Sequence, residues 1–442
     1  MDNTITAPLQ DQTSCKRFWG INLVDGTNSL NMMGFYLCCF TAIMLATFVP
    51  ASQPFLLNEV LLIPYAEQGV LSGTLSFWGE IVIIVTVGFW GSLSDKIGRR
   101  AVTAISYVIT AAGIALYGLA SNPNDLLLSR CIYSAGIAGI STMIITLMAD
   151  YARDESRGKA TGYLGVMNGL GAMIAALALV RLPALYQGQG MDAESAALAT
   201  FVTMGLVTLI FALLLFLSLR PGTSEQHTDK KGLFTHIKEG FGAAKDSGVA
   251  LAYGASFVAR GNLAVVGTFF TLWASVYGTQ NLGMTSAEAI AKGGAIVAIS
   301  YVAALLSAPV FGILSDRISR VSSVSITMLI ALAGYGSTYF VENPFSVPMM
   351  ICLVFIGMAE VGCIISSGVL IAQQATPALR GSIVGVFTFC GAVGILVASI
   401  VGGVLFDTWI KSGPFVFFGF AAGAILIWSL MLRGKVVKPE VN

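Results

Sequence analysis

The sequence predicts an all-α membrane protein with twelve spanning helices arranged as two similar six-helix bundles. Its 442 residues are 56% hydrophobic and 11% charged, with a mean hydropathy of +0.81, whereas soluble proteins carry roughly 25% charged residues. A polar string also occurs twice, as G-S-L-S-D-K-I-G-R-R at 91–100 and as G-I-L-S-D-R-I-S-R at 312–320. A second string, Arg157-Gly158, recurs as Arg380-Gly381 at nearly the same offset. Two unrelated strings that share one offset indicate a duplicated unit.

Each spanning helix requires about 20 mostly apolar residues. The chain contains runs of this kind in equal number in its two halves. They are 30–49, 70–91, 101–120, 126–149, 160–181, 197–219, 248–275, 292–314, 323–341, 347–370, 382–405 and 414–432.

The distribution of basic residues predicts the orientation. If the N-terminus is cytoplasmic, most of the 24 Lys and Arg residues fall in inside segments, and the outside loops hold only Arg181, Lys292 and Lys411. Cytoplasmic loops carry an excess of Lys and Arg in membrane proteins. We therefore expect both termini to be cytoplasmic. Short loops and the lack of an N-x-Ser/Thr sequon favour a bacterial inner membrane.

The same pattern divides the chain into five parts. They are a cytoplasmic N-terminal segment, the two bundles, a cytoplasmic linker between the bundles and a short cytoplasmic tail, at 1–29, 30–219, 248–433, 220–247 and 434–442 respectively. Within the linker, Phe234, Ile237 and Phe241 recur at helical spacing. This spacing predicts a short amphipathic helix that lies on the membrane surface.

The loop string identifies a family resemblance. Gly91, Asp95, Gly98, Arg99 and Arg100 match the pattern G-x-L-(A/S)-D-(R/K)-x-G-R-(R/K) of the major facilitator superfamily. A weaker copy follows helix 8 and contains Gly312, Asp316, Arg317 and Arg320. With these two loop motifs and six predicted spans in each half, the chain resembles this superfamily over roughly residues 30–433. The resemblance implies the fold of that family and a transport function.

The resemblance also implies a gating role for the loop. In the family, the aspartate caps the start of helix 11 in the opposite half and the arginine reaches an acid that ends helix 4. Here these groups are Asp95, the backbone near Gly381, Arg99 and Asp150. Such contacts would favour the outward-facing state. Alternatively, the loops are positively charged only to set the topology.

Four ionisable residues lie inside predicted spans: Glu80, Arg130, Arg260 and Glu360. Each costs about 2.5–3.5 kcal/mol at the membrane centre unless it is paired or hydrated. In the family, helices 1, 4, 7 and 10 line the central cavity. Arg260 on helix 7 and Glu360 on helix 10 are at similar depth, so they can form a pair.

Two main interpretations of Arg260 and Glu360 remain open. They form either a structural ion pair between helices 7 and 10, or a coupling site in which Arg260 binds an anionic substrate group and Glu360 exchanges a proton. In the second case, substrate binding to Arg260 would change the proton affinity of Glu360. Both residues can also face other partners.

Glu80 and Arg130 also allow two interpretations each. Glu80 is either a second proton site or a neutral carboxyl that is hydrogen-bonded to a neighbouring helix. Arg130 matches the arginine of the family's helix 4 pattern R-x-x-x-G-x-G, with Ser134 in place of the first glycine. In proton-driven members that arginine is implicated in proton transfer. Alternatively, Arg130 extends to the membrane interface.

Aromatic and polar residues on the cavity helices are further candidates for substrate binding. They are Tyr36 on helix 1 and Tyr253, Asn262 and Trp273 on helix 7. Aromatic residues at helical spacing more often serve packing, and this alternative remains open.

We expect a secondary active transporter that works by alternating access, and in particular proton-coupled uptake of a small organic anion or zwitterion. The sequence contains no phosphate-binding loop, metal-ligand cluster or nucleophile–base arrangement, so we expect no enzyme activity, no metal and no cofactor other than the proton gradient. The expected partners are the substrate and the lipid bilayer, with no nucleic acid, and the functional unit is a monomer. The alternatives are a proton-coupled efflux antiporter, an uncoupled facilitator with a structural Arg260–Glu360 pair, and a membrane sensor with a transporter fold. Drug exporters of the family carry a proline on helix 5 where this chain has Leu170, which disfavours drug export.

Overall fold

A computed structural model describes residues 17–222, 233–376 and 379–433, apart from the side chains of residues 154, 233–237 and 316. The elements are β1 (Arg17–Phe18), β2 (Ile21–Asn22), α1 (Ser29–Phe55), η1 (Leu56–Val60), α2 (Gln68–Ile97), α3 (Arg99–Tyr117), α4 (Pro123–Tyr151), η2 (Asp154–Ser156), α5 (Arg157–Leu177), η3 (Leu179–Arg181), α6 (Leu182–Gly188), α7 (Ala193–Ser218), α8 (Leu233–Gly242), η4 (Ala243–Lys245), α9 (Ser247–Val265), η5 (Val266–Phe270), α10 (Thr271–Leu282), α11 (Ser286–Arg317), α12 (Arg320–Ser337), η6 (Thr338–Phe340), α13 (Val347–Gln374), α14 (Arg380–Thr408) and α15 (Gly413–Leu432).

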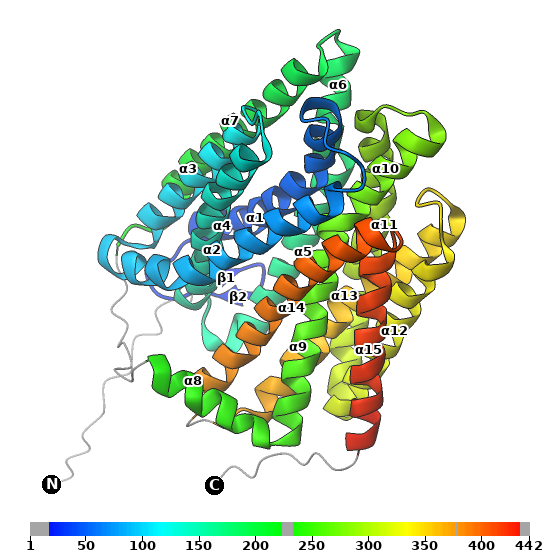
Figure 1. The fold of residues 1–442 in the computed structure, drawn as a ribbon. Coiled ribbons are helices and arrows are strands. Elements are labelled where there is room, and N and C mark those ends of the chain that lie inside the picture. The colour runs from blue at the N-terminus through cyan, green and yellow to red at the C-terminus, as the bar shows by residue number, and fades with distance from the viewer. Residues whose placement is uncertain (1–16, 223–232, 377–378, 434–442) are drawn as a thin grey trace, which may run out of the picture.

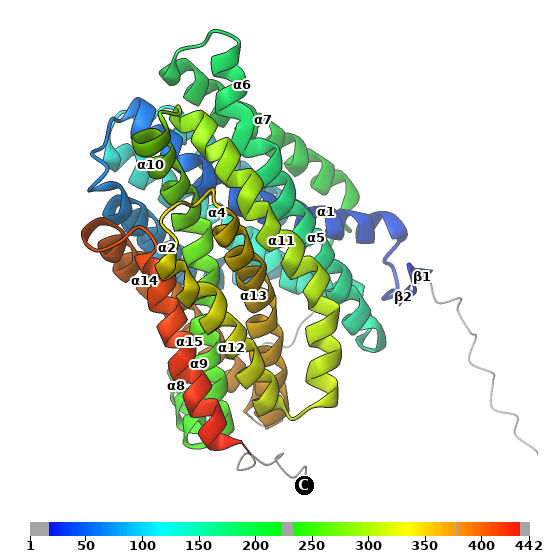
Figure 2. The same ribbon diagram turned by 90° about the vertical axis from the view of Figure 1, so that its right-hand side faces the viewer.

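Twelve helical segments of the described residues are long and apolar enough to cross a membrane. They match the twelve predicted runs in order, so the predicted fold class is confirmed. Eight spans are single helices. The first, fifth, seventh and ninth are composite: α1 with η1, α5 with η3 and α6, α9 with η5 and α10, and α12 with η6. Figures 1 and 2 show the helices as two bundles.

Because successive spans run in opposite directions, the bundle has two distinct ends. We call the end that contains Asp95 and the start of α14 the motif end, and the end that contains Glu59 and Asp407 the distal end. The sequence predicts that the motif end faces the cytoplasm. α2 and α14, which belong to different halves, run antiparallel along each other between these two ends.

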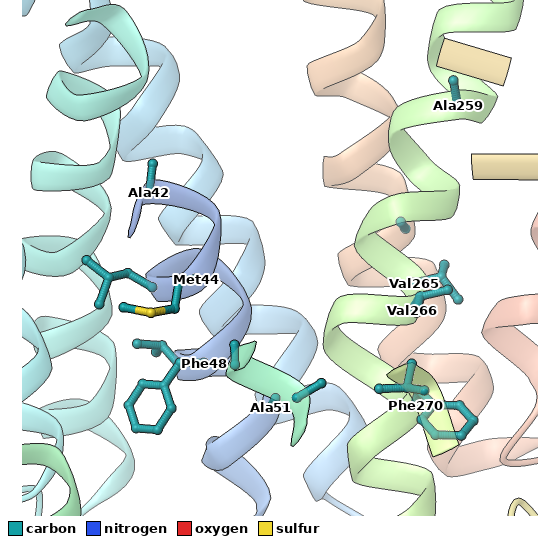
Figure 3. Close-up of a cluster of buried hydrophobic side chains, with 14 of the residues drawn as sticks. Ala42, Met44, Phe48, Ala51, Ala259, Val265, Val266 and Phe270 are labelled. Carbon is teal, nitrogen blue, oxygen red and sulfur yellow. The ribbon is translucent and has the colours of Figure 1, made fainter. Parts of the chain in front are cut away.

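The interior of each half is built from apolar side chains that point away from lipid. Figure 3 shows part of this core, with side chains from α1 and from α9 and η5. Both α1 and α9 lead into a π-helical turn, η1 and η5 respectively. Such turns occur frequently at functional sites of helices.

The two halves pack closely at the distal end. Gly73 of α2 lies directly against the backbone of Ser399 of α14, and Gly403 of α14 lies against the backbone of Gly69. On the other side of the molecule, Gly294 of α11 lies against the backbone of α5 at Ala176. Small residues allow this close approach of helix backbones.

At the motif end the same helices stand apart. A Cβ atom added at Gly158 or Gly162 of α5, or at Gly381 or Gly385 of α14, would have no heavy atom within 4 Å. Among the described residues, the hydrogen bonds between the halves lie towards the distal end. The structure is therefore closed at the distal end and open at the motif end.

Each half begins with a short element that packs on its fifth helix. In the first half this is the β1–β2 hairpin, whose Asn22 N–H donates to Ser156 Oγ at 3.0 Å. In the second half it is α8, where the amphipathic helix was expected, and Ser382 Oγ donates to Glu239 Oε2 at 3.2 Å. The side chains of Phe234 and Ile237 lie outside the described residues.

Candidate functional site

The loop motif forms a turn that only glycine accommodates easily. Gly98 separates α2 from α3 with φ +92° and ψ 152°, a backbone conformation that is essentially restricted to glycine. This turn brings Arg99 back to both acids. Arg99 Nη1 pairs with Asp95 Oδ1 at 2.5 Å, and Arg99 Nε lies 3.3 Å from Asp150 Oδ2. The structure thus contains the Arg99–Asp150 contact that the resemblance implies.

The implied contact of Asp95 with α14 is not made in this open arrangement. The Asp95 side chain is 52% exposed, and the start of α14 carries no side-chain cap at Leu379. Both groups are therefore available to each other when the motif end closes, and the gating role of Asp95 stays a prediction.

The remaining loop residues have local roles. Arg100 stacks on the ring of Phe216 in α7 at 3.9 Å from its centroid. In the second copy, Ser319 has φ −62° and caps α12 with its hydroxyl, so this loop does not need the glycine of the first copy.

Other members of the motif are placed as follows. Gly91 is loosely packed, with Thr142 4.0 Å from an added Cβ, and Gly312 faces open space. Arg320 begins α12. The side chain of Asp316 lies outside the described residues.

The distal end carries a contact of the same kind as the one expected at the motif end. α2 begins at Gln68, and its N-cap residue Glu67 provides no side-chain cap. Asp407, in the last turn of α14, supplies it by accepting from the N–H groups of Gly69 at 2.9 Å and Val70 at 2.7 Å. A carboxylate at a helix N-terminus satisfies free donors and is favoured by the helix dipole.

A second carboxylate makes the reciprocal contact. Glu59 of η1, in the first half, accepts from the N–H of Ser286 at the start of α11, in the second half, at 2.9 Å. Asn58 Nδ2 donates to Ser275 Oγ at 2.8 Å beside it. Each half therefore caps a helix of the other half, and we call Asp407 and Glu59 the distal caps.

A cluster of charged groups lies where the two halves part. Glu80 of α2 is one turn beyond Ser76, whose Oγ still contacts Thr268 of η5 at 3.3 Å. Glu80 interacts electrostatically with Arg260 of the second half and with Arg130 of α4. Two arginines and one glutamate give this central cluster a net charge of +1.

Arg260 is the accessible member of the cluster. It is exposed although it lies in the middle of its span, and its side chain runs over Gly391 of α14, where an added Cβ would be 2.7 Å from Arg260 Cγ. In the described part of the chain, Arg260 forms no ion pair within 4 Å. An exposed guanidinium without a bonded carboxylate can bind an anionic group in two parallel hydrogen bonds.

Arg130 is enclosed rather than extended to the interface. Its Nε and Nη1 atoms are buried and have no hydrogen-bond partner among the described residues. The guanidinium lies 5.5 Å from the ring of Tyr133, and Gly79 of α2 leaves it room, since an added Cβ there would be 3.0 Å from Nε. These contacts favour the enclosed position of Arg130 over the alternative in which it extends to the interface, and its role in proton transfer stays a prediction.

Glu360 does not face Arg260 in this structure. It is 4% exposed, and its Oε1 accepts from the hydroxyl of Tyr335 at 3.4 Å. That hydroxyl also donates to the backbone oxygen of Asn262 at 3.1 Å. Glu360 thus belongs to the interior of the second half, and the carboxyl that interacts electrostatically with Arg260 is Glu80. The expected pair fails because α13 turns Glu360 towards α12.

The polar and aromatic candidates are buried at other places. Tyr36 donates to the backbone of Ala160 at 3.4 Å, and Tyr253 anchors α8 by donating to Gly240 at 2.9 Å. Trp273 is 2% exposed and packs against Phe415. Asn262 is fully buried, with an amide that has no partner among the described residues. Among the described residues, no hydrogen bond joins any of the four to Glu80, Arg130 or Arg260. These contacts favour packing for the three aromatic residues, and substrate binding by any of the four stays a prediction.

The distal caps are absent from the sequence-based candidates. The sequence does contain a feature that could have indicated Asp407, because this acid lies in the last turn of helix 11 as Asp95 lies in the last turn of helix 2. The acid is not followed by the basic residues of the loop motif, however, so no pattern singles it out. Glu59 sits in a π-helical turn that hydropathy does not reveal.

The fold and the central cluster together define a two-bundle membrane transporter. The chain belongs to the Major Facilitator Superfamily, whose family description matches residues 34–295 and 279–442. It is thus a transporter and not an enzyme.

Several known proteins are similar to this chain over most of its length. The magnetosome protein MamH of Paramagnetospirillum magneticum is 25% identical over 409 residues, which is 90% of this chain and 91% of MamH. The multidrug resistance protein MdtG of Citrobacter koseri is 25% identical over 72% of this chain and 76% of MdtG. The crystal structure of the nucleoside transporter NupG superposes with a TM-score of 0.70 over 92% of this chain and 100% of that chain, at 14% identity, which supports the fold.

Proposed function

We propose that the protein is a secondary active transporter that takes up a small organic anion or zwitterion together with a proton. The observation that carries this proposal is the exposed guanidinium of Arg260 in the middle of its span, which interacts electrostatically with Glu80 of the other half. The central cluster has a net charge of +1, so a substrate with one negative group would neutralise it. We further propose a monomer in a bacterial inner membrane with the motif end in the cytoplasm, so that the structure is inward-facing.

The coupling mechanism follows from the proximity of Glu80 to the arginines. Arg260 and Arg130 are the positive charges that act on Glu80, and a nearby positive charge attracts a carboxylate. A substrate anion bound to Arg260 screens that attraction, so proton uptake by Glu80 becomes more favourable when substrate is bound. Proton and substrate then bind cooperatively, which is the requirement for symport.

Substrate class is tested first by thermal unfolding of the purified protein with anionic, zwitterionic and cationic metabolites. Carboxylate compounds are expected to raise the unfolding temperature of the wild type, and Arg260→Gln to weaken their binding by at least about tenfold, because a hydrogen bond to a charged group contributes about 1.5–3 kcal/mol. The matched control is Arg181→Gln, which removes an exposed arginine of η3 and should bind normally. Stabilisation by cations that persists in Arg260→Gln would contradict the anion site.

Coupling is tested in proteoliposomes with Glu80→Gln and Glu360→Gln. Glu80→Gln should abolish accumulation driven by a pH gradient and still permit exchange of labelled for unlabelled substrate. Glu360→Gln should retain both, since Glu360 is turned away from Arg260. Loss of accumulation in Glu360→Gln alone would overturn the assignment of Glu80.

Export is the second candidate, favoured by the similarity to a multidrug resistance protein. In that case Glu80 would attract a cationic substrate and exchange it for a proton. Stabilisation by cationic compounds that is lost in Glu80→Gln would favour export over uptake. Equal substrate levels on both sides under a pH gradient would indicate an uncoupled facilitator.

A further inference from the structure

An apolar groove of about 520 Å³ lies on the first half at the motif end. Its walls come from the β1–β2 hairpin, α1, α5 and α7, with Leu37, Met167 and Leu214 among the lining residues. No residue of the second half lines it. The groove is therefore separate from the path between the halves and from the central cluster.

The walls of the groove are almost entirely apolar. The hydroxyls among its lining residues are already engaged, because Tyr36 donates to the backbone of Ala160 and Ser218 donates to the backbone of Leu215. Three apolar residues at its opening are more than half exposed: Leu30, Met33 and Leu217. An occupant must therefore be apolar where it touches the walls.

The dimensions of the groove fit an acyl chain. The lining residues of α1 run from Leu30 to Phe40, which is about 15 Å along a helix and about half of the roughly 30 Å hydrocarbon core. The groove thus spans one leaflet and starts where α1 enters the membrane. An apolar cavity of about 150 Å³ already binds benzene, so this volume has room for a long chain.

An aromatic cap closes the end of the groove at the predicted membrane surface. Trp19, in the hairpin turn, stacks on Phe18 at 4.8 Å and lies against Tyr163 of α5 at 5.6 Å. Trp19 is still 62% exposed. Tryptophan is enriched at the level of lipid headgroups, so the cap marks the position where a headgroup would lie.

Basic side chains surround this position. Lys159 Nζ approaches Gly20 of the hairpin turn to 3.9 Å from an added Cβ, and it has no bonded partner among the described residues. Arg17 is exposed on β1. The nearby carboxylate of Asp25 is paired with Arg153 at 3.0 Å.

Glu155 is the other carboxylate near the hairpin. It accepts a hydrogen bond from the Asn22 side chain at 3.4 Å. Among the described side chains, Arg17 and Lys159 form no ion pair, although Arg17 Nε donates to Asn22 Oδ1 at 3.1 Å. Two cations therefore stand against the one unpaired carboxylate of Glu155 in the described side chains around the cap.

We propose that this groove binds one anionic phospholipid, with an acyl chain between α1, α5 and α7 and the headgroup at Lys159 and Arg17. An anionic headgroup is favoured over a zwitterionic one because Arg17 and Lys159 form no ion pair among the described residues and outnumber the unpaired Glu155 there. The lipid would hold the hairpin against α1 and α5.

Native mass spectrometry of the detergent-purified protein with equal amounts of phosphatidylglycerol and phosphatidylcholine tests the proposal. One phosphatidylglycerol should be retained in preference. Arg17→Gln and Lys159→Gln together should weaken its retention by about fivefold for each charge removed, while Lys238→Gln on α8 should leave it unchanged. Leu214→Trp fills the groove and should reduce the retention of both lipids.

Three results would overturn the proposal. Equal retention of the two lipids by the wild type would remove the headgroup selectivity. Normal phosphatidylglycerol retention in a folded Leu214→Trp variant would show that the groove is not the binding site. A mass corresponding to two chains in place of a bound lipid would identify a second copy as the occupant. Thermal unfolding of each variant confirms that it is folded, so loss of lipid is not confused with loss of structure.

Discussion

Removal of the Asp407 cap should shift the protein towards the state that is open at the distal end. Asp407 accepts two hydrogen bonds from free N–H groups of α2, and α2 has no cap of its own. In Asp407→Ala these donors have no protein partner while the halves are packed, but they are solvated when the halves separate. The substitution therefore destabilises only the closed distal end.

The size of the shift in Asp407→Ala follows from the two hydrogen bonds that are lost. A hydrogen bond to a charged group contributes about 1.5–3 kcal/mol to stability. Because Asp407 is only half-buried and water replaces it in part, we expect a loss of about 2 kcal/mol for both bonds together. At about 1.4 kcal/mol for each factor of ten, the equilibrium should shift by about 30-fold.

Spin labels at the distal end measure this shift. Gln189 of the first half and Glu342 of the second are both exposed, so cysteines at these positions in a variant without native cysteines can carry the labels. Electron–electron double resonance should show a longer distance in Asp407→Ala than in the parent. Asp125→Ala is the matched control, because Asp125 accepts only local bonds at the start of α4. An unchanged distance in Asp407→Ala, or an equal shift in Asp125→Ala, would refute the reasoning.

Two glycine substitutions test the geometry of the loop motif and of the central cluster. Gly98→Ala should lower the free energy of unfolding by about 1–3 kcal/mol, since the backbone conformation at this position is nearly restricted to glycine. The control Gly88→Ala, within α2, should leave it unchanged because an added Cβ there has no heavy atom within 4 Å. Thermal unfolding compares the two variants, and equal stability would contradict a strained turn at Gly98. Gly391→Val should displace Arg260 and weaken substrate binding without a change of charge, while Gly385→Ala on the same helix should bind normally; unchanged affinity in Gly391→Val would separate Arg260 from the binding site.

The fold could be predicted because its signals are local. A spanning helix is recognised from about 20 apolar residues in succession, and the duplicated loop string divides the chain without reference to tertiary structure. The Arg99–Asp150 contact could be inferred because the resemblance to the family implies it residue by residue.

The central cluster could not be predicted because it depends on how each helix is rotated. Counting residues placed Arg260 and Glu360 at the same depth, but depth does not determine the direction of a side chain. α13 is apolar on nearly all sides, so its sequence does not indicate which face turns towards the cavity. In the structure, the hydrogen bond with Tyr335 holds Glu360 inside the second half, and Arg260 interacts electrostatically with Glu80 instead.

The two ends of the antiparallel pair α2 and α14 are complementary. α2 ends with Asp95 at the motif end, where α14 begins without a cap, and α14 ends with Asp407 at the distal end, where it caps the start of α2. If Asp95 caps α14 when the motif end closes, each state has one helix N-terminus capped by a carboxylate. The free N–H groups of the other helix N-terminus are then hydrated. The Asp95–α14 and Asp407–α2 contacts are of the same kind, so they contribute similar free energies to the two states. The remaining difference in free energy is small enough for the binding of substrate and proton to change which state is favoured.

This complementarity makes a prediction for a pair of variants. Asp407→Asn should favour the state that is open at the distal end, and Asp95→Asn should favour the state that is open at the motif end, each by about tenfold because one charge-assisted contact is weakened. The double variant should return close to the equilibrium of the wild type, because the two losses act in opposite directions on the same transition. The distance between the spin labels reports the equilibrium between the two states in both single variants and in the double variant. A double variant that remains as shifted as either single variant would show that the two ends are not coupled through α2 and α14.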